Sequence, residues 1–159
     1  MYPSRLCLVF VATLVATRAA SAGDFVLGIG PTDFDDSNVS IVELEYHTDP
    51  ILRFGGADIS VAGTLIGHDN GDFFVGFGVS ALRSLSNNWF LEASFMPGFF
   101  ESSEIATDLG SELQFRSLIG IGRTLPNGTR VSLGLSHKSN AGLGSINPGV
   151  NALSLRIRF

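Results

Sequence analysis

The sequence has one cysteine, few basic residues and, beyond its N-terminal segment, no long hydrophobic run. The cysteine, Cys7, lies in that N-terminal segment, so the rest of the chain offers no disulfide, thiol nucleophile or cysteine metal site. Without Arg5 and Arg18, eight basic residues remain against fifteen acidic ones, a net charge of −7. This balance argues against nucleic acid as a partner, because phosphate binding needs a basic surface.

The N-terminal segment has the order of a targeting signal. Arg5 precedes an apolar run from Leu6 to Ala16, and small residues follow, ending Ala20-Ser21-Ala22. This order predicts a secretory signal peptide over residues 1–22, cleaved after Ala22. The alternative is an N-terminal anchor, which the short apolar run and the small residues disfavour. Residues 23–159 are then long enough for one domain.

Apolar residues in this domain come in short alternating pieces separated by Gly, Asn, Asp and Pro, although the mean hydropathy of the chain is +0.31. Alternation with period two predicts strands, and repeated strands of this kind are typical of a transmembrane β-barrel. Six strands are predicted before the C-terminal hairpin, over Asp24–Pro31, Val39–Thr48, Ala57–Gly67, Asp72–Leu82, Trp89–Phe99 and Glu112–Arg123. With the two strands of that hairpin they predict an all-β fold, an eight-stranded antiparallel transmembrane barrel of the outer-membrane type.

A soluble β-sandwich or lipocalin-like barrel is the alternative fold, since its strands alternate too. The high apolar share and the thirteen Phe favour the membrane barrel. The opposite strand faces carry charges of both signs among small residues, which predicts a filled polar lumen rather than an aqueous pore; they are Glu43, Glu45, Asp58, Glu92, Gln114, Arg116 and Arg130. Pro97 predicts a bulge or an early strand end, because proline cannot donate to a ladder.

The C-terminal hairpin places two polar residues on apolar faces. His137 shares the parity of Leu133 and Leu135, and Asn151 shares that of Leu153 and Leu155, so each points to the apolar side at the loop end of its strand. If both termini are periplasmic, the loop Lys138–Gly149 lies outside the cell. His137 and Asn151 then face lipid near the outer leaflet, and a polar residue facing hydrocarbon indicates function.

These residues suggest nucleophilic catalysis. A hydroxyl nucleophile needs a base in reach, and the base needs an orienting partner: Ser139, His137 and Asn151 fill these roles. Asn140, Gly142 and Asn147 in the connecting loop are candidate amide donors to an oxyanion. The competing interpretation is that His-x-Ser occurs by chance and that the loop holds ordinary turn residues.

The motif His137-x-Ser139-Asn140-Ala141, followed by Asn147-Pro148-Gly149 and a last strand, resembles the lipid A 3-O-deacylases (PagL). The resemblance implies an eight-stranded outer-membrane barrel that hydrolyses the 3-position acyl ester of lipid A, in lipopolysaccharide, and releases a 3-hydroxy fatty acid. It implies His137 as base, Ser139 as nucleophile and the three loop residues at the oxyanion site, with Phe115 as the aromatic residue nearby. We expect no metal and no cofactor, because His47 and His68 lie in separate segments. Lys138 is a candidate contact for lipid A phosphates.

One position departs from the family. The family has an acid fourteen residues after the histidine, where this chain has Asn151, and no Asp or Glu follows His137. Asparagine can orient a histidine but adds no charge, so we expect weaker activity, and a gain on Asn151→Glu. Two alternatives stay open: a non-catalytic adhesion or anchoring barrel, and a soluble barrel that binds an apolar ligand with His137 inside. A homodimer is a separate expectation, for which the sequence gives no interface.

Overall fold

The computed structural model describes residues 23–33 and 39–159. The expected signal peptide, residues 1–22 with Cys7, lies outside the described residues, as does part of the acidic loop at 34–38. No helix in the described part of the chain is long and apolar enough to span a membrane.

The described chain forms one closed antiparallel sheet. Its strands are β1 (Asp24–Pro31), β2 (Ser40–His47), β3 (Leu52–Phe54), β4 (Ala57–His68), β5 (Phe73–Ser84), β6 (Trp89–Glu101), β7 (Leu113–Thr124), β8 (Arg130–Ser139) and β9 (Val150–Arg158). The sheet order is β2-β1-β9-β8-β7-β6-β5-β4-β3, and pairing of β2 with β4 closes the barrel. Eight long strands therefore form the wall, as the alternation predicted. The short β3 pairs with β4 and lies between two predicted strands, where the alternation predicts none.

The barrel is apolar outside, and its interior holds many charged and polar side chains beside a smaller apolar cluster that includes Ile66, Phe74 and Phe100. Large apolar side chains cover the outer face, with Ile119 at 66% exposure as an example, whereas Glu43 and Arg116 are fully buried in the lumen. Such an apolar exterior is unfavourable in water and favourable in the hydrocarbon core of a bilayer. The soluble alternatives are therefore wrong, and the structure is a transmembrane-type β-barrel.

Ion pairs fill the lumen. Arg116 donates to Glu45 at 2.8 Å and to Glu43 at 3.1 Å, while Arg156 donates to both carboxylates, at 2.7 Å to Glu45. Each charge has a partner, as buried charges require. The predicted filled lumen is thus confirmed, with Arg156 as a member that the strand pattern had left unnamed.

Pro97 does not end its strand. β6 continues to Glu101 and pairs with β7 through Pro97 itself. On the β5 side the ladder is interrupted beside the proline and resumes in the same register, with Gly76 opposite Gly98 and Val79 opposite Phe95. The expected bulge or early end is therefore wrong. The proline removes hydrogen bonds to β5, and the continuous pairing of β6 with β7 keeps the strand extended there.

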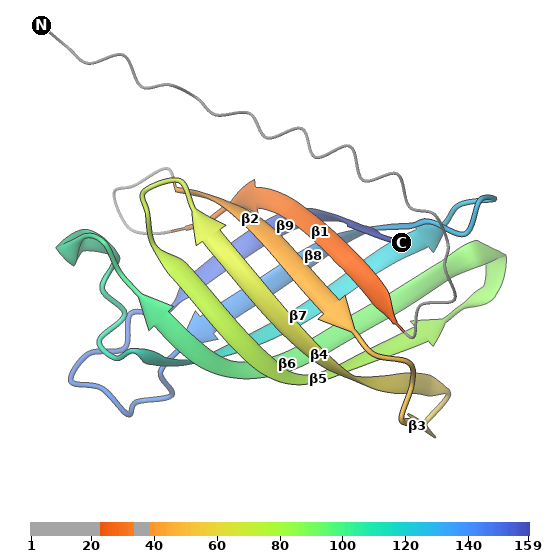
Figure 1. Cartoon of the computed structure of the whole chain (residues 1–159), viewed down its shortest axis with the longest axis horizontal. Coiled ribbons are helices and arrows are strands. Elements are labelled where there is room, and N and C mark those ends of the chain that lie inside the picture. The colour runs from red at the N-terminus through yellow and green to blue at the C-terminus, as the bar shows by residue number, and fades with distance from the viewer. Residues whose placement is uncertain (1–22, 34–38) are drawn as a thin grey trace, which may run out of the picture.

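The two ends of the barrel differ (Figure 1). The β6–β7 and β8–β9 loops lie together at one end, and β3 and the short β5–β6 and β7–β8 turns lie at the other. The candidate catalytic residues are at the end with the long loops, where β8 stops and β9 starts. Their placement at the outer leaflet stays a prediction, because it depends on which end of the barrel faces outward.

Candidate active site

His137 points out of the barrel. It is exposed, as are Leu133 and Leu135 on the same strand face, whereas the alternate residues Ser132 and Ser136 are buried. In the register of β8 with β9, His137 lies directly opposite Asn151, which is also exposed. The predicted pair on the lipid-facing side is confirmed.

The two side chains are hydrogen-bonded. Nδ1 of His137 lies 2.8 Å from Oδ1 of Asn151. The amide oxygen only accepts, so Nδ1 carries the ring hydrogen and Nε2 is left as the acceptor. This is the tautomer that a general base needs if Nε2 is to take a proton from a hydroxyl.

Two hydroxyls lie near the imidazole on the outer face. Ser139 is two residues farther along β8, a separation of roughly 7 Å in extended chain. Ser117 of β7 lies opposite His137 and is exposed too. Within the described residues, neither hydroxyl is hydrogen-bonded to the ring, and catalytic hydrogen bonds often tighten only in the substrate complex. Strand periodicity pointed to Ser139, but only the register of β7 and β8 reveals Ser117.

Phe115 stands beside the candidate nucleophile. It pairs with Ser139 across β7 and β8, and its ring stacks on Phe95 with centroids 6.0 Å apart. The two rings therefore form an aromatic surface next to Ser139 on the outer face. The placement predicted for Phe115 is the placement observed.

The loop residues hold one another in place. Asn140 is buried; its side chain donates to the carbonyls of Leu109 (2.8 Å) and Ile146 (2.7 Å), and its backbone N–H donates to Oδ1 of Asn147. The Gly142 N–H donates to Oδ1 of Asn140 at 2.8 Å. An oxyanion role for Asn140 or Gly142 would require these bonds to be exchanged. Among the described residues, Nδ2 of Asn147 has no partner and is the amide donor left over.

Lys138 lies inside the barrel, so its expected contact with lipid A phosphates is wrong. Its exposure is 6%; Nζ lies 3.3 Å from Nε2 of His68 and 4.6 Å from the centroid of the Phe100 ring. The reason is strand parity, because adjacent residues of a strand point to opposite faces. A lysine next to an outward histidine must point inward.

Asp33 is the residue that the sequence did not point to. Its carboxylate accepts a hydrogen bond from Nδ2 of Asn151 at 2.6 Å and another from the Asn151 backbone N–H at 2.5 Å. Partial burial raises the pKa of Asp33, but these hydrogen bonds and the nearby His137 lower this pKa more, so the net shift is downward. An eight-stranded barrel requires its first and last strands to pair, and this requirement could have placed the end of β1 beside the start of β9.

A small cavity adjoins this group. Its volume is about 160 Å³, and it lies between the β6–β7 and β8–β9 loops, lined by Asp33, Ala106, Asp108, Leu109, Pro148, Gly149 and Asn151. No three His, Cys, Asp or Glu side chains of the described residues are grouped to hold a metal ion.

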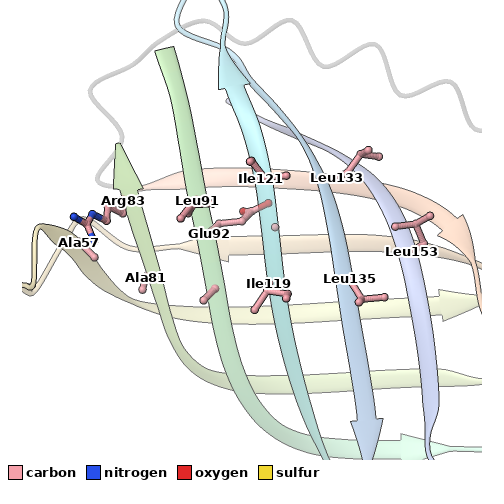
Figure 2. A pocket seen from close by; sticks show the side chains of 12 residues that line it. Ala57, Ala81, Arg83, Leu91, Glu92, Ile119, Ile121, Leu133, Leu135 and Leu153 are labelled. Atoms are coloured by element: carbon pink, nitrogen blue, oxygen red, sulfur yellow. The ribbon is translucent and has the colours of Figure 1, made fainter. Parts of the chain in front are cut away.

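A larger apolar hollow lies on the lipid-facing wall (Figure 2). Its volume is about 550 Å³, and the small side chains of Ala81 and Ala93 leave room there between larger neighbours. Leu135 and Leu153 line it as well, and this facing pair lies two residues from the His137–Asn151 pair toward the other end of the barrel. The hollow therefore starts next to the candidate site and extends away from the long loops.

Known proteins share this fold and this sequence pattern. A family model described as Lipid A 3-O-deacylase (PagL) matches residues 28–159. Lipid A deacylase PagL of Bordetella bronchiseptica (strain ATCC BAA-588 / NCTC 13252 / RB50) is 37% identical over 72 residues, which are 45% of this chain and 40% of that relative.

Two solved structures share the barrel. The crystal structure of the outer membrane enzyme PagL superposes with a TM-score of 0.71 at 22% identity, covering 86% of this chain and 98% of that chain. A de novo designed transmembrane β-barrel reaches a TM-score of 0.60 at 6% identity, over 87% and 94% of the two chains. The chain is an outer-membrane β-barrel, and it belongs to the lipid A 3-O-deacylase (PagL) family.

Proposed function

We propose that this chain is a serine esterase that removes the 3-position acyl chain of lipid A in the outer leaflet. The observation that carries the proposal is the outward imidazole of His137, held through Nδ1 by Asn151, with Ser139 on the same face. A non-catalytic barrel has no need for such a pair on its lipid-facing wall, where polar groups are costly.

In the proposed reaction Ser139 Oγ attacks the ester carbonyl carbon while Nε2 of His137 takes its proton. The tetrahedral oxyanion accepts a hydrogen bond from Nδ2 of Asn147. The ester C–O bond then breaks, and His137 returns the proton to the departing 3-oxygen of the sugar. Water attacks the acyl-serine, again through His137, and releases the fatty acid with Ser139 restored.

The site suits a substrate that arrives through the membrane. Phe115 and the adjoining apolar hollow offer a surface for an acyl chain that stays in hydrocarbon while its ester reaches Ser139. All of these residues come from one chain, so the mechanism requires no second copy. A homodimer remains a prediction.

Mass spectrometry of lipid A from cells that express the variants tests the proposal. We expect loss of one hydroxyacyl chain with the wild type and with Ser117→Ala, and at least about a 1000-fold lower rate with Ser139→Ala. Identical spectra for the wild type and Ser139→Ala would favour the non-catalytic barrel. If only Ser117→Ala loses activity, the nucleophile is Ser117 of β7 and not Ser139.

A further inference from the structure

Barrel closure brings an acidic residue to the amide that replaces the family's acid. Asp33 follows the end of β1, and β1 pairs with β9. The Asp33 N–H donates to the Asn151 carbonyl at 3.0 Å, one step beyond the bridge between Thr32 and Ala152. The side chain of Asp33 is thereby set against Asn151, 118 positions away in the sequence.

The orientation of the Asn151 amide decides which imidazole nitrogen is free. With Oδ1 toward His137, the ring carries its hydrogen on Nδ1 and Nε2 can accept a proton. With the amide turned over, Nδ2 would donate to Nδ1, the hydrogen would move to Nε2, and the ring could no longer act as base. Asparagine alone does not choose between these states, because its two ends have almost the same shape.

We infer that Asp33 is a positioning residue that sets this choice and completes a relay Ser139–His137–Asn151–Asp33. This inference rests on the proposed function. An ionised carboxylate only accepts, so it requires Nδ2 of Asn151 to face Asp33, which turns Oδ1 to His137. The second bond, from the Asn151 backbone N–H, keeps the carboxylate in line.

Asp33 also supplies the negative charge that position 151 lacks. As His137 takes the serine proton it becomes an imidazolium, and a carboxylate beyond the amide stabilises this charge, more weakly than one in direct contact. The hydrogen bonds from Asn151 favour the charged form of Asp33, so the carboxylate is ionised at neutral pH. The relay thus terminates in a carboxylate, which comes from the N-terminal part of the chain.

Exchange of the two side chains tests the relay, using the full chain folded in detergent and an ester substrate. In Asp33→Asn the side chain at position 33 becomes an amide, which can also donate and therefore no longer fixes the orientation of the Asn151 amide. We expect a 10- to 100-fold lower kcat, about the loss seen when a partner that orients a histidine is removed. KM should change little, since substrate contacts stay. The combined variant Asp33→Asn with Asn151→Asp restores every hydrogen bond and returns a carboxylate to the imidazole, so kcat should recover to the wild-type value or above.

Asp108→Asn is the matched control. Asp108 lines the same cavity, but its carboxylate accepts from the Gly110 N–H and not from Asn151. We expect wild-type kcat for this variant. Wild-type kcat in Asp33→Asn, or a loss that the combined variant does not repair although it folds, would overturn the inference.

A spectroscopic measurement separates this inference from the proposed function. In ¹⁵N-histidine-labelled wild-type protein we expect the His137 ring to carry its hydrogen on Nδ1, and in Asp33→Asn a shift of the population toward Nε2. The same tautomer in both proteins would count against Asp33. If the wild type hydrolyses no ester, the esterase proposal fails, and the ring tautomer still reports on Asp33.

The effect of Asn151→Glu depends on Asp33, which contacts position 151. The substitution would bring a second carboxylate against Asp33, and two like charges in contact destabilise each other. We therefore expect the gain predicted for Asn151→Glu to be largest when Asp33→Asn is present.

Discussion

Gly149 lies against the imidazole of His137: a Cβ atom at position 149 would be 2.9 Å from Cε1 and 3.5 Å from Nε2 of that ring. The backbone of Gly149 also has a positive φ of 67°. Glycine at this position therefore keeps both the loop conformation and the space beside Nε2, the nitrogen proposed to take the proton.

Gly149→Ala is expected to lower kcat by about 10- to 100-fold, because the methyl group displaces the ring from its position near Ser139. Ester hydrolysis in detergent measures the effect. Gly55→Ala is the control, because Gly55 also has a positive φ, 58°, but open space around its Cβ position. Equal activity of the two variants would show that the ring tolerates displacement.

Asn147→Asp and Asn147→Ala together test the oxyanion donor. Aspartate keeps an oxygen for the Asn140 N–H but removes the NH₂ group, whereas alanine removes both. If Nδ2 stabilises the oxyanion, both variants lose about 100- to 1000-fold in kcat. Activity near the wild type in Asn147→Asp, with loss only in Asn147→Ala, would instead assign Asn147 to loop structure.

Arg156→Met is expected to destabilise the barrel by about 3–5 kcal/mol, because it removes the one cation that contacts three buried carboxylates and leaves Glu43 and Glu45 to share Arg116. Urea unfolding in detergent measures this loss. Arg53→Met, at the exposed pair of Arg53 with Asp58, should leave the unfolding midpoint almost unchanged. Similar midpoints for both variants would contradict the importance of the lumen network.

Asp72 joins the β4–β5 and β6–β7 loops, and this link should depend on pH. Its carboxylate accepts from the Ser103 N–H at 2.6 Å and from the Ser103 hydroxyl at 2.8 Å. Partial burial raises the pKa of Asp72, but these bonds and one from Asn70 lower the pKa more, so it lies below its ordinary value. A depressed pKa means that the link is fully present above the unfolded-state pKa, about 4, and is lost as pH falls through the lower folded-state value.

We therefore expect the amide of Ser103 to be protected from hydrogen exchange at neutral pH, and this protection to fall only below about pH 4. Asp72→Asn should reduce it at neutral pH and remove its dependence on pH below about 4. Asp69→Asn is the control. Asp69 lies in the same turn as Asp72, but its carboxylate accepts a hydrogen bond from the Ser40 N–H and none from Ser103. Unchanged protection in Asp72→Asn would show that other contacts hold the loop.

Much of the fold could be predicted from the sequence, because period two is a local property. Alternation identified the eight wall strands, the outward direction of His137 and the charged lumen. The same rule places Lys138 inward, which excludes its expected contact with lipid A phosphates. β3 was missed because three residues carry too short a pattern, and the continuation of β6 through Pro97 depends on a neighbour that the local sequence does not show.

The sequence by itself determined a barrel with an oily exterior, and a histidine and a serine on that exterior at the loop end of β8, since parity along one strand settles which side a residue faces. Only the tertiary structure decided which residues meet across strands. The register of β7 with β8 put Phe115 and Ser117 beside the site, and the pairing of the first and last strands delivered Asp33 to Asn151. A pairing depends on both strands and on the turn or sheet closure that aligns them, so parity along one strand does not contain it.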